Sequence, residues 1–151
     1  MDYISSRGQS PAVDSAQAVL SGLAPDGGLY MPRAIPAFDW QHCLTLSAQQ
    51  MSAAILSVLL PDIPNMEALV KRAYTGKFET EDLTPTVPVG DFQVLELFRG
   101  PTSAFKDVAL SMLPQLLTAA KQEKGIAQEI RILTATSGDT GKAALVGFQD
   151  V

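Results

Sequence analysis

The sequence has few of the residues that build metal centres and disulfides. Its 151 residues include one cysteine, Cys43, and one histidine, His42. A single cysteine excludes a disulfide framework and any cysteine-based zinc site. Two adjacent residues cannot complete a metal site by themselves, so we interpret both as ordinary packing or surface positions. No metal site is predicted.

An excess of positive charge and long apolar runs are also missing. The formal net charge is −5 at pH 7, which argues against general binding to nucleic acid because that needs a clustered basic surface. No apolar run is long enough to cross a membrane, and the first residues resemble neither a secretory signal nor a transit peptide. We therefore expect a cytoplasmic protein without nucleic-acid or membrane partners. The composition, 46% hydrophobic and 18% charged, is that of a globular domain with a core.

Capping residues and apolar spacing predict helices throughout the first half of the chain. Asp14 can cap the first of them, and Ser47 and Gln50 have the spacing of a capping box for the second. A glycine follows the first and the third, and a proline follows the second, as is typical of helix ends. We expect residues 1–83 to form a helical N-terminal domain. The predicted helices cover 15–21, 47–60 and 64–74.

The chain changes character after the proline-rich stretch 84–90, which we interpret as an extended connection and a domain boundary. A strand, a helix, a second strand and a second helix follow, an order typical of a parallel α/β sheet. Pro114 should kink the first of these helices, because the hydrogen bond to the Leu110 carbonyl is lost. The predicted segments are strands at 92–98 and 129–136 and helices at 103–124 and 140–149.

Two parallel strands do not make a complete sheet, because they cannot cover their own edges or bury both faces. A third strand would be expected close to Val151, where the sequence stops. We therefore interpret the chain as a fragment of an α/β protein. Its helical N-terminal unit would be followed, over residues 84–151, by the beginning of a larger parallel α/β domain that is truncated here.

Lys106 is the first candidate for chemistry. It follows an apolar segment and a Gly-Pro turn, and it stands in the first turn of the helix predicted at 103–124. A cation there faces the partial positive charge of the helix N-terminus, a mismatch of roughly 0.3–1 kcal/mol. A lysine whose ammonium form is disfavoured spends more time as a free amine, which Schiff-base chemistry requires. The alternative is a solvated lysine near a helix start.

The second candidate is the turn T-A-T-S-G-D-T-G-K at 134–142, between a predicted strand and the next helix. Its backbone N–H groups, hydroxyls and two glycines suit a carboxylate or a phosphate. It is not a Walker A loop, because Thr136 replaces the leading glycine and Ala143 replaces the magnesium-binding hydroxyl. The alternative is a capped helix start. Both candidates follow consecutive strands at the edge where open parallel sheets bind ligands.

Four segments, in order, resemble the threonine synthases, pyridoxal-phosphate enzymes of fold type II. Residues 97–107, L-F-R-G-P-T-S-A-F-K-D, are similar to the family's F-H-G-P-T-x-A-F-K-D. Residues 3–8, Y-I-S-S-R-G, resemble Y-x-S-T-R-G, and residues 22–32 resemble G-L-A-P-D-G-G-L-Y-x-P. Residues 134–141 resemble T-A-T-S-G-D-T-G. The matches extend over almost the whole chain, which resembles the first third of such an enzyme.

The resemblance implies roles for several residues. Lys106 would hold pyridoxal 5′-phosphate as a Schiff base, and the amine released by the substrate, O-phospho-L-homoserine, would move protons at its α, β and γ carbons. Phosphate would leave from Cγ, water would add at Cβ, and L-threonine would be released. Asp139 would lie against the cofactor's phenolic edge, Phe105 would pack in the core, and Arg7 would lie near the substrate phosphate. The substrate carboxylate would bind Ser137, Gly138, Thr140 and Gly141.

Two residues depart from the family pattern, and other functions stay open. Arg99 replaces a histidine, and Asp139 stands where many fold-type-II enzymes have asparagine, so its carboxylate needs a proton or a cation beside the cofactor. One alternative is a phospho-lyase for a related phosphorylated hydroxy-amino acid. Another is a non-catalytic fragment that binds an anion or a partner. The intact Lys106 argues against this second alternative. The fragment alone is expected to be inactive, and the sequence does not indicate its oligomeric state.

Overall fold

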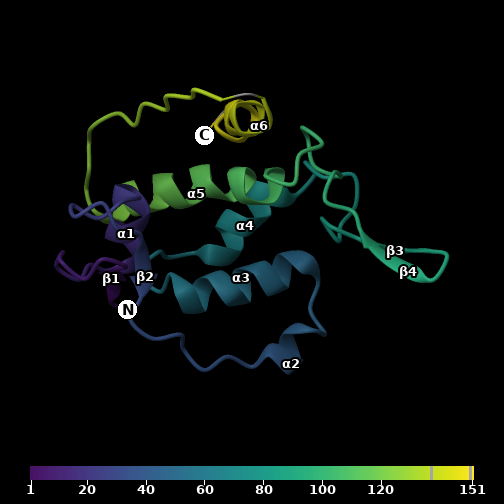
Figure 1. The fold of residues 1–151 in the computed structure, drawn as a ribbon, viewed down its shortest axis with the longest axis horizontal. Coiled ribbons are helices and arrows are strands. Elements are labelled where there is room, and N and C mark those ends of the chain that lie inside the picture. The colour runs from purple at the N-terminus through teal and green to yellow at the C-terminus, as the bar shows by residue number, and fades with distance from the viewer. Residues whose placement is uncertain (137, 150) are drawn as a thin grey trace.

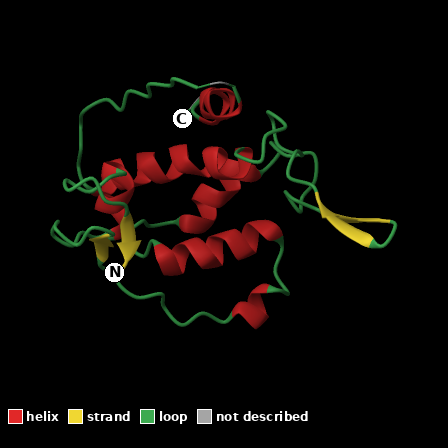
Figure 2. Cartoon of the chain, viewed as in Figure 1, coloured by secondary structure: helices red, strands yellow, loops and turns green. Residues whose placement is uncertain are grey.

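The computed structural model describes residues 1–136, 138–149 and 151 as a bundle of helices with two small antiparallel sheets (Figures 1 and 2). Helix α5 crosses the middle of the molecule, α4 lies between α5 and α3, and α6 lies over α5 (Figure 1). The short α2 is at the opposite side from α6. The elements are β1 (Tyr3–Ser5), α1 (Ser15–Ser21), β2 (Tyr30–Pro32), α2 (Trp40–Cys43), α3 (Ala48–Leu59), α4 (Met66–Tyr74), β3 (Thr86–Val89), β4 (Phe92–Leu95), α5 (Asp107–Glu123) and α6 (Asp139–Gly147).

The helices of the first half confirm the predicted caps. Asp14 accepts a hydrogen bond from the Gln17 amide at the start of α1. The capping box of α3 is complete, because the Ser47 hydroxyl accepts from the Gln50 amide and the Gln50 side chain accepts from the Ser47 amide. These bonds satisfy backbone donors that the first turn of a helix leaves without partners.

One hydrophobic core joins the first half of the chain to α5. Helix α4 is its centre, with Leu69, Val70 and Ala73 almost fully buried. Met112 and Leu116 of α5 belong to the same cluster, and α5 packs against both α1 and α4. The Lys124 ammonium at the end of α5 also pairs with the Asp14 carboxylate. Both predicted domains contribute to this core. The domain boundary near residue 84 stays a prediction.

The strands differ from those predicted. β1 and β2 form an antiparallel pair that the sequence did not indicate. The stretch 84–90, predicted as a connection, contains β3, which pairs antiparallel with β4 and projects from the bundle (Figure 1). β4 ends at Leu95, short of the predicted Phe98, because the chain then turns back towards Glu79, whose amide donates to the Arg99 carbonyl.

The strand predicted at 129–136, and with it the parallel pairing, is not formed within the described chain. Residues 129–136 form no strand, and no parallel pair occurs among the described residues. A strand is defined by its hydrogen-bonded neighbours, and no other strand of the described chain pairs with this segment. Helix α5 begins at Asp107 and not at 103, since residues 101–106 form consecutive turns.

Candidate functional site

The turn at residues 100–106 is built around the buried carboxylate of Asp107. This side chain is only 2% exposed, and it accepts hydrogen bonds from the Thr102 amide (2.8 Å) and the Thr102 hydroxyl (2.5 Å). A Cβ on Gly100 would lie 2.5 Å from Asp107 Oδ2, so the residue at this position must be glycine for the chain to pass. Ser103 adopts the left-handed region, with φ of 59°. The Gly-Pro turn thereby sets the start of α5.

Lys106 is the residue that immediately precedes α5. Its Nζ lies 4.3 Å from the centre of the Phe105 ring, within the range of a cation–π interaction. None of the ion pairs among the described residues involves Lys106. Asp107, the nearest acidic residue in sequence, directs its carboxylate to Thr102 instead. The lysine amine is therefore not neutralised by a carboxylate of the described chain.

An open apolar groove of about 490 Å³ runs along α5 from Lys106. Tyr74, Leu110 and Leu113 line it, together with Phe105. Phe105 is 61% exposed at the edge of this groove, so its predicted packing in the core is wrong.

Tyr74 fixes the first turn of α5 from below. Its hydroxyl donates to the Val108 carbonyl across 3.0 Å, and burial raises the pKa of this phenol to about 12. The hydroxyl therefore remains a donor at physiological pH. The ring also packs edge-on against Phe78 at 5.7 Å. The hydrogen bond to Val108 joins α4 to the first turn of α5, which directly follows Lys106.

The second predicted site lies at the N-terminus of α6, where Gly138 precedes the helix with φ of 154°. Asp139 is in the first turn, where its negative charge suits the helix dipole. A Cβ on Gly141 would collide with the Thr136 side chain, which shows how closely the preceding segment folds over this turn. Thr140 is the second helical residue. Ser137, also predicted to bind the substrate carboxylate, lies outside the described residues.

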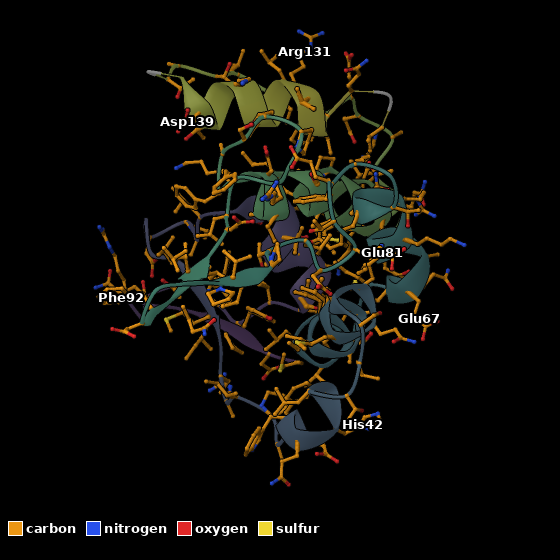
Figure 3. All side chains as sticks on the ribbon, turned by 90° about the vertical axis from the view of Figure 1, so that its right-hand side faces the viewer. His42, Glu67, Glu81, Phe92, Arg131 and Asp139 are labelled. Atoms are coloured by element: carbon orange, nitrogen blue, oxygen red, sulfur yellow. The ribbon has the colours of Figure 1, made fainter. Side chains whose placement is uncertain are left out.

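The structure brings these two turns together through the packing of α6 on α5. The Lys142 ammonium, in the first turn of α6, donates to the Thr102 carbonyl across 3.0 Å. At the other end of α6, Gly147 approaches the Leu110 carbonyl so closely that a Cβ would overlap it. Lys106 and the 138–141 turn thus belong to one side of the molecule. Figure 3 shows Asp139 at this end and His42 at the opposite end.

Arg7 lies elsewhere. Its guanidinium donates to the Asp26 carbonyl across 3.1 Å, beside β1 and β2. These strands lie near α1, at the end of α5 where Lys124 pairs with Asp14 (Figure 1). The 17 residues of α5 extend over roughly 25 Å between that end and Lys106. Within this chain Arg7 is therefore separate from the other site residues, and its contact with the substrate phosphate stays a prediction.

Arg99, which departs from the family pattern, pairs with two carboxylates. Its guanidinium lies 2.8 Å from Glu79 and 2.7 Å from Glu96. The hydrogen bonds with Glu79 and then Glu96 raise the pKa of Arg99. The arginine also lies 5.1 Å from the centre of the Phe98 ring. These contacts fasten the segment after β4 to the residues after α4.

Sequence reasoning missed Asp107, Lys142 and Tyr74, all of which shape the site. The only signal for Asp107 was its place after Lys106 at a helix start, where acidic residues are common. Lys142 resembled part of a phosphate-binding loop, and that resemblance gave no hint of its bond to Thr102. Among the described residues no cluster of metal-ligating side chains occurs, and no helix there is long and apolar enough to cross a membrane.

Comparison with known proteins identifies similar sequences and folds. The family model described as the threonine synthase N terminus matches residues 2–74. The threonine synthase of Methylobacillus glycogenes is 40% identical over 95% of this chain and 33% of its own length. A threonine synthase-like 2 protein of Xenopus laevis is 37% identical over 96% of this chain and 32% of its own length.

The fold agrees with that of a solved structure. The pyridoxal-phosphate-bound threonine synthase of Brucella melitensis superposes with a TM-score of 0.87 at 39% identity. The match covers 98% of this chain and 33% of that protein. The chain therefore spans about a third of the length of the relatives that it matches. Its mixture of helices and short strands is the one found in that third.

Proposed function

We propose that this chain is part of a threonine synthase and supplies the cofactor-bearing lysine of an enzyme that makes L-threonine. The substrates would be O-phospho-L-homoserine and water, and the second product would be phosphate. The observation that carries the proposal is the close superposition on a threonine synthase that holds pyridoxal phosphate. The cytoplasmic location predicted from the sequence stays a prediction.

The chain's own residues fit the cofactor at Lys106. The amine lies at the mouth of an open groove, beside an exposed aromatic ring and without a carboxylate partner among the described residues. Such an amine is suited to covalent attachment to an aldehyde. Pyridoxal phosphate, when bound, supplies an electron sink that stabilises negative charge on the substrate carbons. Lys106 would hold it and then act as the proton carrier.

The proton transfers assigned to Lys106 account for the overall reaction. The amine removes protons from Cα and Cβ of the substrate, and the C–O bond at Cγ breaks with loss of phosphate. One of these protons is returned to Cγ and the other leaves with the phosphate, while water adds its hydroxyl at Cβ and its proton at Cα. Lys106 is the only residue of this chain that we place at these carbons.

The turn before α6 would bind the substrate carboxylate. Gly138, Thr140 and Gly141 present backbone N–H groups at a helix N-terminus, where an anion is stabilised. Ser137 belongs to the same predicted set. Asp139 would lie at the cofactor's oxygen, and its charge requires a proton or a neighbouring cation there.

Covalent trapping tests the assignment of Lys106. The full-length protein that carries these residues would be loaded with pyridoxal phosphate, reduced with borohydride and digested, and the labelled peptide mapped. We expect the label on Lys106, and its loss in Lys106→Ala but not in Lys121→Ala at the other end of α5. Removing the proton carrier should also lower kcat by about 10²–10⁴-fold. A label on another lysine would refute the assignment.

A second candidate function is supported by the threonine synthase-like 2 relatives, which are 37% and 35% identical to this chain. It is a phospho-lyase that acts on a related phosphorylated hydroxy-amino acid. Release of both phosphate and threonine from O-phosphohomoserine favours the first function. Phosphate release without threonine favours the second. Labelling of Lys106 without turnover of any such substrate favours a binding role alone.

A further inference from the structure

Lys142 joins the two turns on which the proposed function depends. Its Nζ reaches from the first turn of α6 to the Thr102 carbonyl, 3.0 Å away. The amide and the hydroxyl of the same threonine both donate to Asp107, at the first position of α5. Thr102 is therefore held from α5 on one side and from α6 on the other. Hydrogen bonds of this kind, with one charged partner, are roughly twice as strong as neutral ones.

The turn that Lys142 holds determines the position of Lys106. Thr102 is 5% exposed, and the next residue, Ser103, has the left-handed φ of 59°. Two backbone bonds of about 3.0 Å close the turn, from Ser103 to the Gly100 carbonyl and from Asp107 to the Ala104 carbonyl. A shift of Thr102 would therefore be transmitted to Lys106 through a short, constrained segment.

A close contact between α5 and α6 lies at the far end of α6. Gly147 packs directly against the Leu110 carbonyl, where no side chain would fit. α6 is thus held at its C-terminal end by close packing against α5, and at its N-terminal end Lys142 bonds to the turn that precedes α5. Loss of the Lys142 bond would leave the Gly147 packing intact and remove the hydrogen bond that ties the end carrying residues 138–141 to the turn before α5.

We propose that Lys142 is a positioning residue, an inference that rests on the proposed function. Through the Thr102 carbonyl it fixes the distance between the carboxylate-binding turn and Lys106, and it does not itself touch the substrate. A direct role in binding the substrate phosphate is the competing explanation for a lysine at this place. The two roles differ in what happens to the affinity for a free anion.

Kinetics of the full-length enzyme separate the two roles. The variants are Lys142→Met, Lys142→Arg and, as matched control, Lys121→Met in the last turn of α5. We expect kcat to fall about tenfold to 100-fold in Lys142→Met, as for a displacement of about 1 Å, and to recover largely in Lys142→Arg. Inhibition by inorganic phosphate should stay unchanged. The proposal is wrong if Lys142→Met matches Lys121→Met, or if its phosphate inhibition weakens as KM rises.

Amide hydrogen exchange tests whether Lys142 holds the two turns together, and it does not require an active enzyme. In the cofactor-free full-length protein, amides of residues 138–142 and 101–107 should exchange faster in Lys142→Met than in Lys121→Met. Equal exchange in the two variants would overturn the proposal. If the wild type does not act on O-phosphohomoserine, the proposed function fails, and the exchange result still decides whether Lys142 holds the two turns together.

Discussion

At the scale of single residues, Asp26 shows how one carboxylate can organise a loop. It accepts hydrogen bonds from the Ser5 hydroxyl (2.7 Å) and from the amides of Gly28 and Gln9 (both 2.9 Å). The bond from Ser5, followed by those from Gly28 and Gln9, lowers the pKa of Asp26 from 3.8 to about 2. The turn at 25–28 and the residues after β1 are therefore held by one ionised side chain.

This carboxylate predicts a pH dependence of stability. Its pKa is lower in the folded chain than in the unfolded one, so the unfolded state binds more protons between about pH 4 and pH 2. Its contribution is present above pH 4 and is lost as the pH falls towards 2. We expect Asp26→Asn to lower the urea midpoint of the full-length protein at pH 7, with a difference that shrinks below pH 4.

Asp91, at the exposed tip of the β3–β4 hairpin, is the matched control for this experiment. Asp91→Asn should change the urea midpoint much less than Asp26→Asn at pH 7, because it removes no hydrogen-bonded carboxylate of the kind that holds the 25–28 turn. At about pH 2.5 the pH lies between the pKa values of Asp26 in the folded and unfolded chain. A difference in urea midpoint between wild type and Asp26→Asn that stays constant down to this pH would refute the linkage.

Individual residues were predictable where a local rule applies and not where a distant contact decides. The caps at Asp14 and Ser47 follow from hydrogen bonds within one helical turn, so their sequence signals were sufficient. The bond between Lys142 and Thr102 joins positions 40 residues apart, which no local rule connects. Phe105 was misplaced because helical spacing indicates which residues share a face, whereas neighbouring elements decide whether that face is covered.

At the scale of elements, the crossing of α5 and α6 depends on a proline and a glycine. Pro114 is fully buried inside α5 and lacks an N–H, so the Leu110 carbonyl has no helical donor four residues on. Gly147 of α6 packs against this same carbonyl. The absent donor and the absent side chain together allow the two backbones to approach. The predicted kink at Pro114 stays a prediction.

Substitution of this glycine tests the close approach. A methyl group at residue 147 would overlap the Leu110 carbonyl, so α6 would have to move away from α5. We expect Gly147→Ala to lower the unfolding free energy of the full-length protein by about 1–3 kcal/mol, the usual cost of overpacking. The exposed Gln149, just beyond α6, provides the control Gln149→Ala. Equal unfolding free energies for the two variants would show that the helices do not depend on this contact.

The elements themselves divide by the source of their stability. α1, α3, α4, α5 and α6 have caps or apolar stripes within their own segments and were predicted with small errors in their bounds. β1 and β2 have three residues each and depend on pairing with each other and on the bridge between Tyr3 and Val13. Residues 129–136 have the composition of a strand but no strand partner among the described residues, and pairing cannot be predicted from the sequence of one segment alone.

At the scale of the whole molecule, the second half leaves much apolar surface open. Every residue of β4 is exposed, with Phe92 at 75%, and Leu133 in the unpaired segment is 95% exposed. Figure 3 shows Phe92 at the hairpin that extends from the body of the molecule. The backbone groups on the outer edges of a two-stranded hairpin have no partners and are available for pairing. In relatives about three times as long, further chain is available to cover such surfaces.

The isolated 151-residue chain should therefore self-associate and lack turnover. Strand edges and apolar patches of this kind pair with other copies when nothing else covers them. We expect the sedimentation coefficient to rise with protein concentration, and this rise to weaken in Phe92→Lys/Val94→Lys, since a charge on an edge opposes pairing. Leu44→Lys is the control, because Leu44 is 69% exposed but lies just after α2, away from the hairpin. A monomer that unfolds cooperatively and retains pyridoxal phosphate would show instead that these residues alone complete the site.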